Sequence, residues 1–350
     1  MMARGIRILP ALLIPAVIAG AGILAGNAYV KKAEAEFAGN EAAMAEVQLA
    51  GVMEKLNQKD YSGMYAATQS IEPTLDSEEA YLARLGEVFA DRDMTKVSCM
   101  LINETETQRE YQLTDGDTLL GTMVLLKKDG TLQPAFALHG NESYRVEVPS
   151  GMTLKAGDTV VGTEYLVKKR EEAANFFQVT DPTIIPAVDI YELTGLLGEP
   201  ELNKEEGYSM IQDVLSKDWL LGKTVTDEKL KQELIDAAVL IAEYPARDAS
   251  LASVQAVSDT SSRWYQKYVT LQNAWFTAHD KHSVSNEGIK AVQQSDDTIV
   301  SHIWFDYFAD NGEVNRTWHV GYQLTFRKSG DKWIVCGTEL NSLLNPAQPH

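Results

Sequence analysis

Cysteine is nearly absent from this sequence of 350 residues, which contains two, Cys99 and Cys336. Small disulfide-stapled scaffolds carry more cysteines, so the sequence excludes that class. Both cysteines lie in apolar runs typical of strands, where a free cysteine usually serves as a small buried side chain. We expect two free thiols, and the sequence leaves a Cys99–Cys336 bridge open.

Basic residues are scarce as well. The chain has 31 Lys and Arg against 50 Asp and Glu, a net charge of −19. Four of the basic residues and none of the acidic ones precede position 33, so the remainder has 27 basic and 50 acidic residues, a net charge of −23. This negative field repels phosphate backbones and anionic headgroups, so we expect no nucleic-acid partner.

Recognised catalytic signatures are also missing. The sequence has no phosphate-binding loop, no nucleophile elbow and no zinc-ligand spacing. From motifs alone we therefore predict no cofactor, no metal and no catalytic residue.

The sequence does have a long apolar start. Residues 8–30 contain no charged side chain, and two arginines precede them and two lysines follow. About 20 apolar residues suffice for a helix to cross a bilayer. We predict a cytoplasmic tail and a transmembrane anchor over residues 1–32, with the acidic remainder on the extracytoplasmic side of the cell membrane.

A cleaved secretory signal is the alternative, which would make the protein secreted. Such signals have a shorter apolar region and end in a small-residue cleavage site, and the best site here, near Ala28, is poorly formed. Positive residues on both sides make the charge rule for orientation weak. The outward orientation therefore rests on the usual export of a long acidic body behind one N-terminal anchor.

The pattern over residues 33–140 predicts helices followed by strands. Apolar positions recur with helical spacing, including a helix around Leu85 that Asp76 or Ser77 caps. After Asp93 the period changes to two, and four strands separated by glycine turns follow.

The middle of the chain is less regular. Over residues 141–202, short alternating segments punctuated by Pro and Gly predict a small β domain. For residues 203–245 we predict a linker and a helix, which Thr226 caps and Pro245 ends. Residues 246–350 again predict helices and then four strands, at about 282–293, 298–308, 317–328 and 332–340.

The two ends of the body thus share one plan, helices followed by a four-stranded antiparallel meander, with similar last hairpins at 125–132 and 326–333. This order suggests two copies of one α+β fold. Residues 275–340 resemble an NTF2-like (SnoaL-like) cone, in which helices pack into the concave face of a curved sheet, and the N-terminal end resembles it less closely. The resemblance implies a transmembrane helix and two NTF2-like domains, over 33–140 and 246–350, separated by a small β unit.

The middle block, at 144–151 and 191–200, is similar to a β unit of membrane-anchored proteins of Gram-positive bacteria with this domain order. A more distant resemblance is to teicoplanin-resistance-associated membrane proteins, whose extracytoplasmic part ends in an NTF2-like domain. This chain lacks the cysteine-rich zinc segment of the second family, so sensing through that segment is not implied.

NTF2-like enzymes place an Asp or His base inside the cone, which makes His302, Asp306 and His319 weak catalytic candidates. Period two puts His302 and Asp306 on the strand face opposite Ile303 and Tyr307, and it turns His319 outward on the next strand. We expect the apolar face to form the core. The polar groups then face solvent or a partner and do not converge in a pocket.

Several aromatic residues could line a ligand pocket, although aromatics at helical spacing more often form core. These weak ligand-binding candidates are Trp264, Tyr268, Trp275, Trp304 and Tyr322.

His279, Asp280 and His282 form a separate cluster. His and carboxylate side chains can hold a divalent cation, whereas a helix C-terminus also favours histidine. Three residues within four positions rarely reach one metal without further ligands, so we favour the helix end.

Three functional hypotheses follow. The favoured one is a non-enzymatic, membrane-anchored extracytoplasmic protein that binds a ligand, an envelope protein or a cell-wall polymer. The others are a lyase or isomerase with a pocket in the C-terminal domain, and a structural spacer. The resemblance also implies a homodimer through the outer sheet face, which bears Trp304 and His319. An enzyme would show a polar-lined buried cavity, whereas a binding module would show a filled cone and an exposed apolar patch.

Overall fold

The computed structural model describes residues 41–71, 73–128, 131–271 and 278–349. Their helices and mainly antiparallel strands make an α+β protein, as predicted. The predicted anchor at 8–30 lies outside the described residues. No helix in the described ranges is both long enough and apolar enough to span a membrane.

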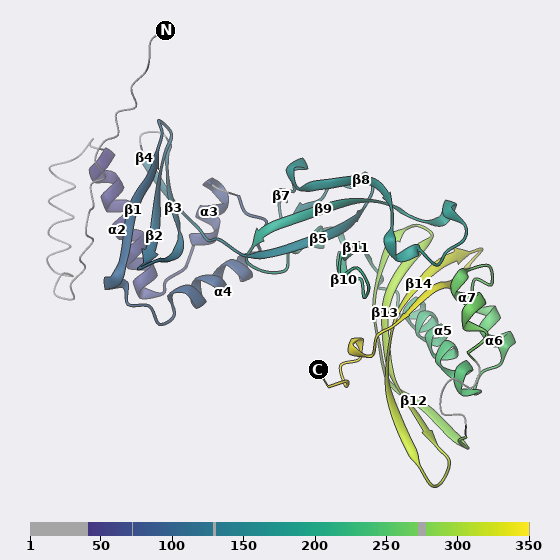
Figure 1. The fold of residues 1–350 in the computed structure, drawn as a ribbon. Coiled ribbons are helices and arrows are strands. Elements are labelled where there is room, and N and C mark those ends of the chain that lie inside the picture. The colour runs from purple at the N-terminus through teal and green to yellow at the C-terminus, as the bar shows by residue number, and fades with distance from the viewer. Residues whose placement is uncertain (1–40, 72, 129–130, 272–277, 350) are drawn as a thin grey trace. The chain divides into compact units, whose positions relative to one another are not determined.

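The chain forms two compact units. Unit 1 extends to Glu142 and also contains Thr194–Pro200, and unit 2 comprises Ser143–Leu193 and Glu201–His350. The elements of each unit can be followed by colour and label in Figure 1.

Unit 1 contains three described helices and a four-stranded antiparallel sheet in the order β1-β2-β3-β4. The elements are α2 (Glu41–Gln58), α3 (Met64–Ile71), α4 (Glu78–Phe89), β1 (Val97–Glu104), β2 (Gln108–Asp115), β3 (Thr118–Lys128) and β4 (Thr131–Ala137). Helices and then a meander is the predicted order, and Ser77 caps α4 by accepting a hydrogen bond from the Ala80 N–H. Buried apolar side chains of helices and strands together form the core of this unit.

Unit 2 contains a larger sheet, in the order β15-β14-β13-β12-β11-β5-β9-β8, with β10 paired to β11. Its strands are β5 (Glu142–Pro149), β8 (Leu166–Glu172), β9 (Ala187–Leu196), β10 (Tyr208–Gln212), β11 (Trp219–Thr224), β12 (Lys281–Ser295), β13 (Thr298–Asp310), β14 (Asn315–Ser329) and β15 (Lys332–Leu340). Its helices are α5 (Glu228–Ala246), α6 (Leu251–Ala256) and α7 (Arg263–Tyr268), and a short pair, β6 (Lys155–Ala156) and β7 (Thr159–Val160), stands apart from the large sheet.

The middle strands continue the C-terminal sheet, which differs from the separate β domain and linker predicted over 141–202 and 203–245. Strand β11 pairs in parallel with β5, at Trp219 and Val146, and antiparallel with β12, at Lys223 and Gln293. Residues 208–224 are a hairpin because β10 and β11 pair along five positions. Two strands of five and six residues are too short for a clear period-two pattern, so the sequence did not reveal them.

The helices of unit 2 cover one face of strands β12 to β15 (Figure 1). The register confirms the predicted facing of β13, since Ile303, Phe305 and Tyr307 are fully buried in the core under the helices. The alternate residues lie on the opposite face of the sheet.

Helix α5 continues past the predicted stop at Pro245. It ends at Ala246, with Arg247 in the left-handed region at φ 74°. Proline has no N–H to donate to the carbonyl of Ile241 four residues earlier. The Tyr268 hydroxyl donates to that carbonyl instead, at 2.5 Å, so the last turn persists. The observed N-cap is Asp227, one residue after the predicted Thr226.

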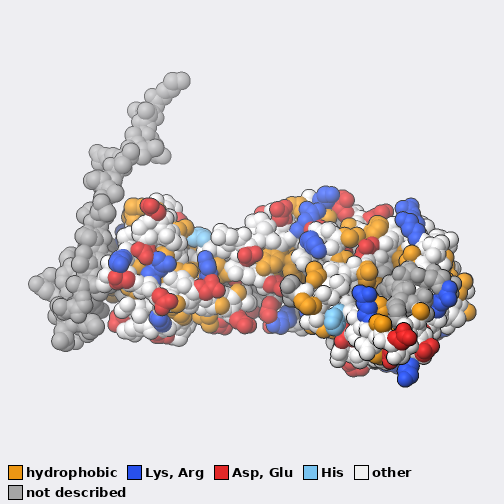
Figure 2. All heavy atoms as spheres, turned by 60° about the horizontal axis from the view of Figure 1, so that its bottom comes forward, with side chains coloured by type: hydrophobic (Ala, Val, Ile, Leu, Met, Phe, Trp, Pro, Cys, Tyr) orange, Lys and Arg blue, Asp and Glu red, His pale blue; other side chains and the backbone are white. Residues whose placement is uncertain are grey.

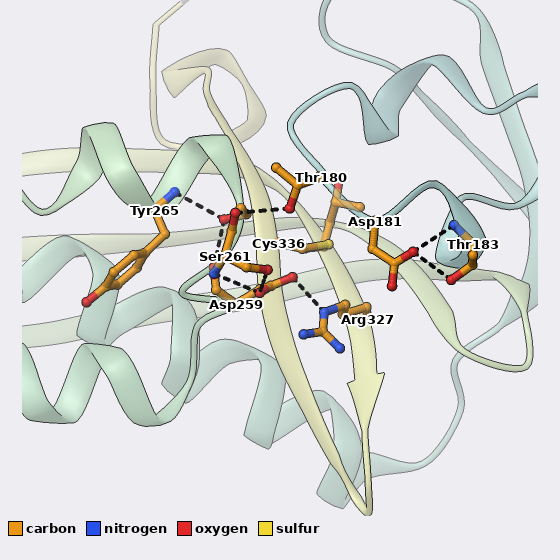
Figure 3. A network of polar contacts seen from close by, with 10 residues as sticks. Thr180, Asp181, Thr183, Asp259, Ser261, Tyr265, Arg327 and Cys336 are labelled. Carbon is orange, nitrogen blue, oxygen red and sulfur yellow. Dashed lines mark hydrogen bonds and ion pairs between the residues drawn. The ribbon is translucent and has the colours of Figure 1, made fainter.

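An ion pair between a half-buried arginine and a buried aspartate connects the segment before α7 to the sheet (Figure 3). The Arg327 Nε on β14 donates to the Asp259 carboxylate at 2.7 Å, and the Ser261 N–H and hydroxyl donate to its other oxygen at 3.0 and 2.6 Å. Burial alone would raise the pKa of Asp259, but these hydrogen bonds outweigh burial and hold the pKa below its usual range. The Thr180 hydroxyl donates to the Ser261 carbonyl at 3.0 Å, which ties the loop before β9 to the same point.

Both cysteines are free thiols, which excludes the Cys99–Cys336 bridge. Cys336 is fully buried on β15, and Cys99 is partly buried on β1. Burial raises the pKa of the Cys99 thiol to about 11 and also raises the pKa of the Cys336 thiol, so neither cysteine is an activated nucleophile.

Candidate functional site

The space between α5–α7 and the C-terminal sheet is filled with apolar and aromatic side chains. Three of the ligand-binding candidates are part of this core: Trp264, Tyr268 and Tyr322 are buried, and the rings of Trp264 and Tyr268 stack with centroids 5.0 Å apart. The candidate Trp275 lies outside the described residues. Trp264, Tyr268 and Tyr322 therefore pack in the core and do not line a pocket.

Trp304 lies on the opposite face of the sheet. It pairs with Gly288 on the neighbouring strand, and a Cβ at position 288 would overlap its indole ring. The glycine thus leaves space for the ring, which explains the absence of a side chain there.

Asp306 and His319 face each other on adjacent strands. The His319 Nδ1 lies 2.7 Å from an Asp306 oxygen, the Asn286 amide donates to the other oxygen at 2.7 Å, and the Asn345 amide donates at 3.2 Å. Burial would raise the pKa of Asp306, but these partners hold it below its usual range. The prediction that Asp306 faces solvent or a partner is wrong, because the C-terminal turn with Asn345 covers it.

His302 is buried on the same face, which also corrects the prediction. Its Nε2 lies 3.2 Å from the Gln323 Oε1, and the Gln323 amide donates to the Asp213 carboxylate at 2.6 Å. Burial lowers the pKa of His302, so the neutral imidazole is favoured. The segment around Asp213, which connects β10 and β11, covers this histidine. The three catalytic candidates therefore lie on the face of the sheet opposite the helices, each bonded to other side chains of the unit.

A buried polar group that the sequence did not indicate lies in unit 2. Glu147 on β5 is 2% exposed, and burial, followed by repulsion from Asp218 and Asp213, raises its pKa to about 7. Its Oε2 has no hydrogen-bond partner among the described residues, and neither has the Asn175 Oδ1. Burial thus favours the protonated form of the Glu147 carboxyl group over the charged form.

A second group gathers at the end of α5, and we name it the Asp248 cluster: Glu243, Asp248, His279, His282 and Tyr307. The His279 Nε2 lies 2.9 Å from Asp248, and the His282 Nδ1 lies 3.3 Å from it. The His282 Nε2 lies 3.5 Å from the Glu243 carboxylate, and the Tyr307 hydroxyl donates to Asp248. Asp280 is exposed and is not among these partners. The sequence indicated the two histidines but missed both carboxylates, which lie more than 30 residues away.

Unit 1 contains a small cavity of about 220 Å³ between α2, α3 and β4. Its lining is mostly apolar or lacks a side chain, and Lys55 and Gln48 are its polar members. Ligand pockets usually measure about 300–1,000 Å³, so this cavity suits a small molecule at most.

Comparisons with known proteins assign no family. No family model matches the chain, and no curated protein matches its sequence. Among solved structures, an "Ntf2 like protein involved in plasmid conjugation" is similar over 70% of this chain and 76% of its own length, at 15% identity and a TM-score of 0.24. A TM-score this low carries no argument about function, and the fold described above rests on its own topology.

Proposed function

We propose that this protein is a non-enzymatic module that is tethered through residues 8–30 and binds a protein partner outside the cell membrane. In this proposal each unit carries an NTF2-like fold that serves as a scaffold. The filled cone supports binding over chemistry, because Asp306, His302 and His319 hold the outer face of the sheet together instead of lining a pocket.

The observation that carries the proposal is the exposed apolar edge of unit 1. Strand β1 is at the end of its sheet and pairs only with β2 among the described strands. Met100, Leu101 and Ile102 are consecutive there, with 49%, 44% and 48% of their surfaces exposed. Proteins usually protect such an edge, and an extended peptide can add to it as a further strand.

The negative charge of the body favours a basic protein segment over an anionic polymer as the partner. The body carries a net charge of −23, and Glu104 and Glu110 lie at the same end of the sheet as Ile102, where Arg109 is ion-paired with Glu104 at 2.8 Å. An anionic wall polymer would be repelled, whereas an extended protein segment with Lys or Arg beside its apolar residues would be attracted. Figure 2 shows acidic side chains scattered among basic and apolar ones in this view.

The test is site-specific crosslinking in intact cells. A photoreactive amino acid at Leu101 should give one discrete crosslinked protein, whereas the same group at Leu215, which is exposed in unit 2, should not. The substitution Ile102→Lys should reduce the product by about tenfold, and Ile102→Val should preserve it, since a lysine at the edge opposes strand addition and repels a basic partner segment.

Other outcomes decide between the alternatives. A product of twice the chain's mass would indicate that the partner at this edge is a second copy of the chain. No product at Leu101, or a product unaffected by Ile102→Lys, would contradict the proposal and favour a structural spacer.

A further inference from the structure

The Asp248 cluster concentrates negative charge at a helix end that is itself negative. Helix α5 ends in a Schellman motif, in which the Arg247 N–H donates to the Tyr244 carbonyl and the Asp248 N–H donates to the Glu243 carbonyl, at 3.1 and 3.0 Å. This turn requires a left-handed residue, here the non-glycine Arg247 at φ 74°. It brings Glu243 and Asp248 to the C-terminus, where the helix dipole disfavours anions.

Two carboxylates at this position need a nearby cation. The facing side chains come from the segment before β12, from β12 and from β13, and they are His279, His282 and Tyr307. No Lys or Arg is paired with Glu243 or Asp248 among the described ion pairs. Burial raises the pKa of Glu243, and a metal ion bound beside Asp248 would balance the remaining negative charge.

The ligand atoms lie close enough together to hold one metal ion. Metal–ligand bonds of about 2.0–2.1 Å in a tetrahedron separate neighbouring ligand atoms by about 3.3 Å. One ligand atom each from Asp248, His279 and His282 lie within 4.8 Å of one another, and the Asp248 carboxylate is 2.9 and 3.3 Å from the two imidazole nitrogens.

The surrounding groups have the arrangement that metal sites use. The Glu243 carboxylate lies beside the Nε2 of His282, opposite the Nδ1 that faces Asp248, so it can fix the ring tautomer. Tyr307 donates to Asp248, and its ring is nearly parallel to that of His282, with centroids 6.0 Å apart. His279 is 3% exposed, Asp248 14% and His282 36%, so one side of the cluster is accessible to solvent.

We propose that Asp248, His279 and His282 bind one divalent transition metal ion, with Zn²⁺ the best match to two imidazoles and a carboxylate. The fourth position then belongs to water or to an external ligand on the exposed side. The ion would add to the contacts of His282 on β12 with Glu243 and Asp248 at the end of α5. This proposal revises the helix-end interpretation of the histidines and is independent of the edge strand of unit 1.

The test measures zinc binding by the full chain, purified in detergent without a histidine tag and stripped with EDTA. Equilibrium dialysis against ZnCl₂ near neutral pH, followed by elemental analysis, should give about one zinc per chain. Co²⁺ in place of Zn²⁺ should give visible absorption bands of a four-coordinate site. His279→Gln, His282→Gln and Asp248→Asn should each weaken zinc binding by at least about 100-fold, and Glu243→Gln by about 10- to 100-fold.

His319→Gln is the matched control, because it removes a histidine from the other Asp–His pair of unit 2. It should leave the stoichiometry at about one. Because His279 is buried, His282→Gln, at the exposed position, decides the test if His279→Gln fails to fold. The proposal is overturned if the wild-type chain binds no zinc, or if His282→Gln binds it as tightly as the wild type does.

Discussion

At the scale of single residues, Tyr268 compensates for a hydrogen bond that Pro245 cannot make. Its hydroxyl donates to the Ile241 carbonyl, and burial raises its pKa well above the usual range, so it stays protonated as a donor. Tyr268→Phe would leave a buried carbonyl without its partner and should reduce the free energy of unfolding by about 1–3 kcal/mol. All six tryptophans lie in unit 2, so urea unfolding followed by tryptophan fluorescence reports on this unit alone.

The matched variant for this prediction is Pro245→Ala, which restores an N–H four residues after Ile241. The double variant Pro245→Ala/Tyr268→Phe should lose less stability than the two single effects sum to, with a coupling of about 0.5–1.5 kcal/mol. Strict additivity would show that the hydroxyl does not substitute for the missing N–H.

Glu147 gives unit 2 a specific pH dependence. Its pKa is about 7 in the folded chain against 4.5 for the free group, so the folded state holds the proton more tightly. The stabilising contribution of protonated Glu147 to the free energy of unfolding is therefore fully present below about pH 4.5. It decreases as the pH rises from about 4.5 to about 7 and is lost above about pH 7. Glu147→Gln should remove this decline and stabilise unit 2 at pH 8 by about 1–3 kcal/mol.

The measurement is urea unfolding by tryptophan fluorescence at several pH values between 5 and 8, compared with Glu192→Gln. Glu192 is exposed on the neighbouring strand β9, so its substitution should leave the pH profile unchanged. If Glu147→Gln follows the wild-type profile, burial does not control the titration of this carboxyl group.

At the scale of elements, the hydrophobic period predicted what local sequence determines. The four C-terminal strands lie within three residues of their predicted bounds, because Ile303, Phe305 and Tyr307 alternate with polar positions. The continuous sheet of unit 2 was not predictable, since the pairing of β11 with β5 and β12 joins segments more than 60 residues apart. The Asp248 cluster was half predictable for the same reason, because its histidines are local and its carboxylates come from the end of α5.

Two glycines in different elements should respond in opposite directions to alanine. Gly288→Ala on β12 should destabilise unit 2 by about 1–3 kcal/mol, because the added methyl group overlaps Trp304. Gly51→Ala in α2 should stabilise unit 1 by about 0.5–1 kcal/mol, because nothing lies within 4 Å of its Cβ and alanine favours helix. Hydrogen–deuterium exchange, read separately on peptides of each unit, measures both effects. A neutral Gly288→Ala would show that Trp304 moves away without cost.

At the scale of the whole molecule, each unit repeats the order of helices and then a four-stranded meander, while unit 2 adds the middle strands to its sheet. In each unit, apolar side chains of the helices and strands pack into an internal core. The features proposed here for contact with other molecules lie at an edge and an end: the β1 edge in unit 1 and the end of α5 in unit 2. The β1 edge serves the proposed function only if the body is outside the cell membrane.

Cysteine labelling in intact cells tests whether the body lies outside the cell membrane and whether residues 8–30 remain in the mature chain. In a Cys99→Ser background, where the remaining Cys336 is buried, single cysteines are introduced as Asp158→Cys in the exposed part of unit 2 and as Ala3→Cys in the N-terminal tail. With an uncleaved anchor, a membrane-impermeant maleimide should label Asp158→Cys in intact cells and Ala3→Cys only after permeabilisation, and both chains should stay in the membrane after an alkaline wash. Signal cleavage would remove position 3 from the mature chain and shorten it by about the length of such a signal. Labelling of Ala3→Cys but not Asp158→Cys in intact cells would contradict the extracytoplasmic placement, because the charged body would then lie on the inner side, away from any envelope partner.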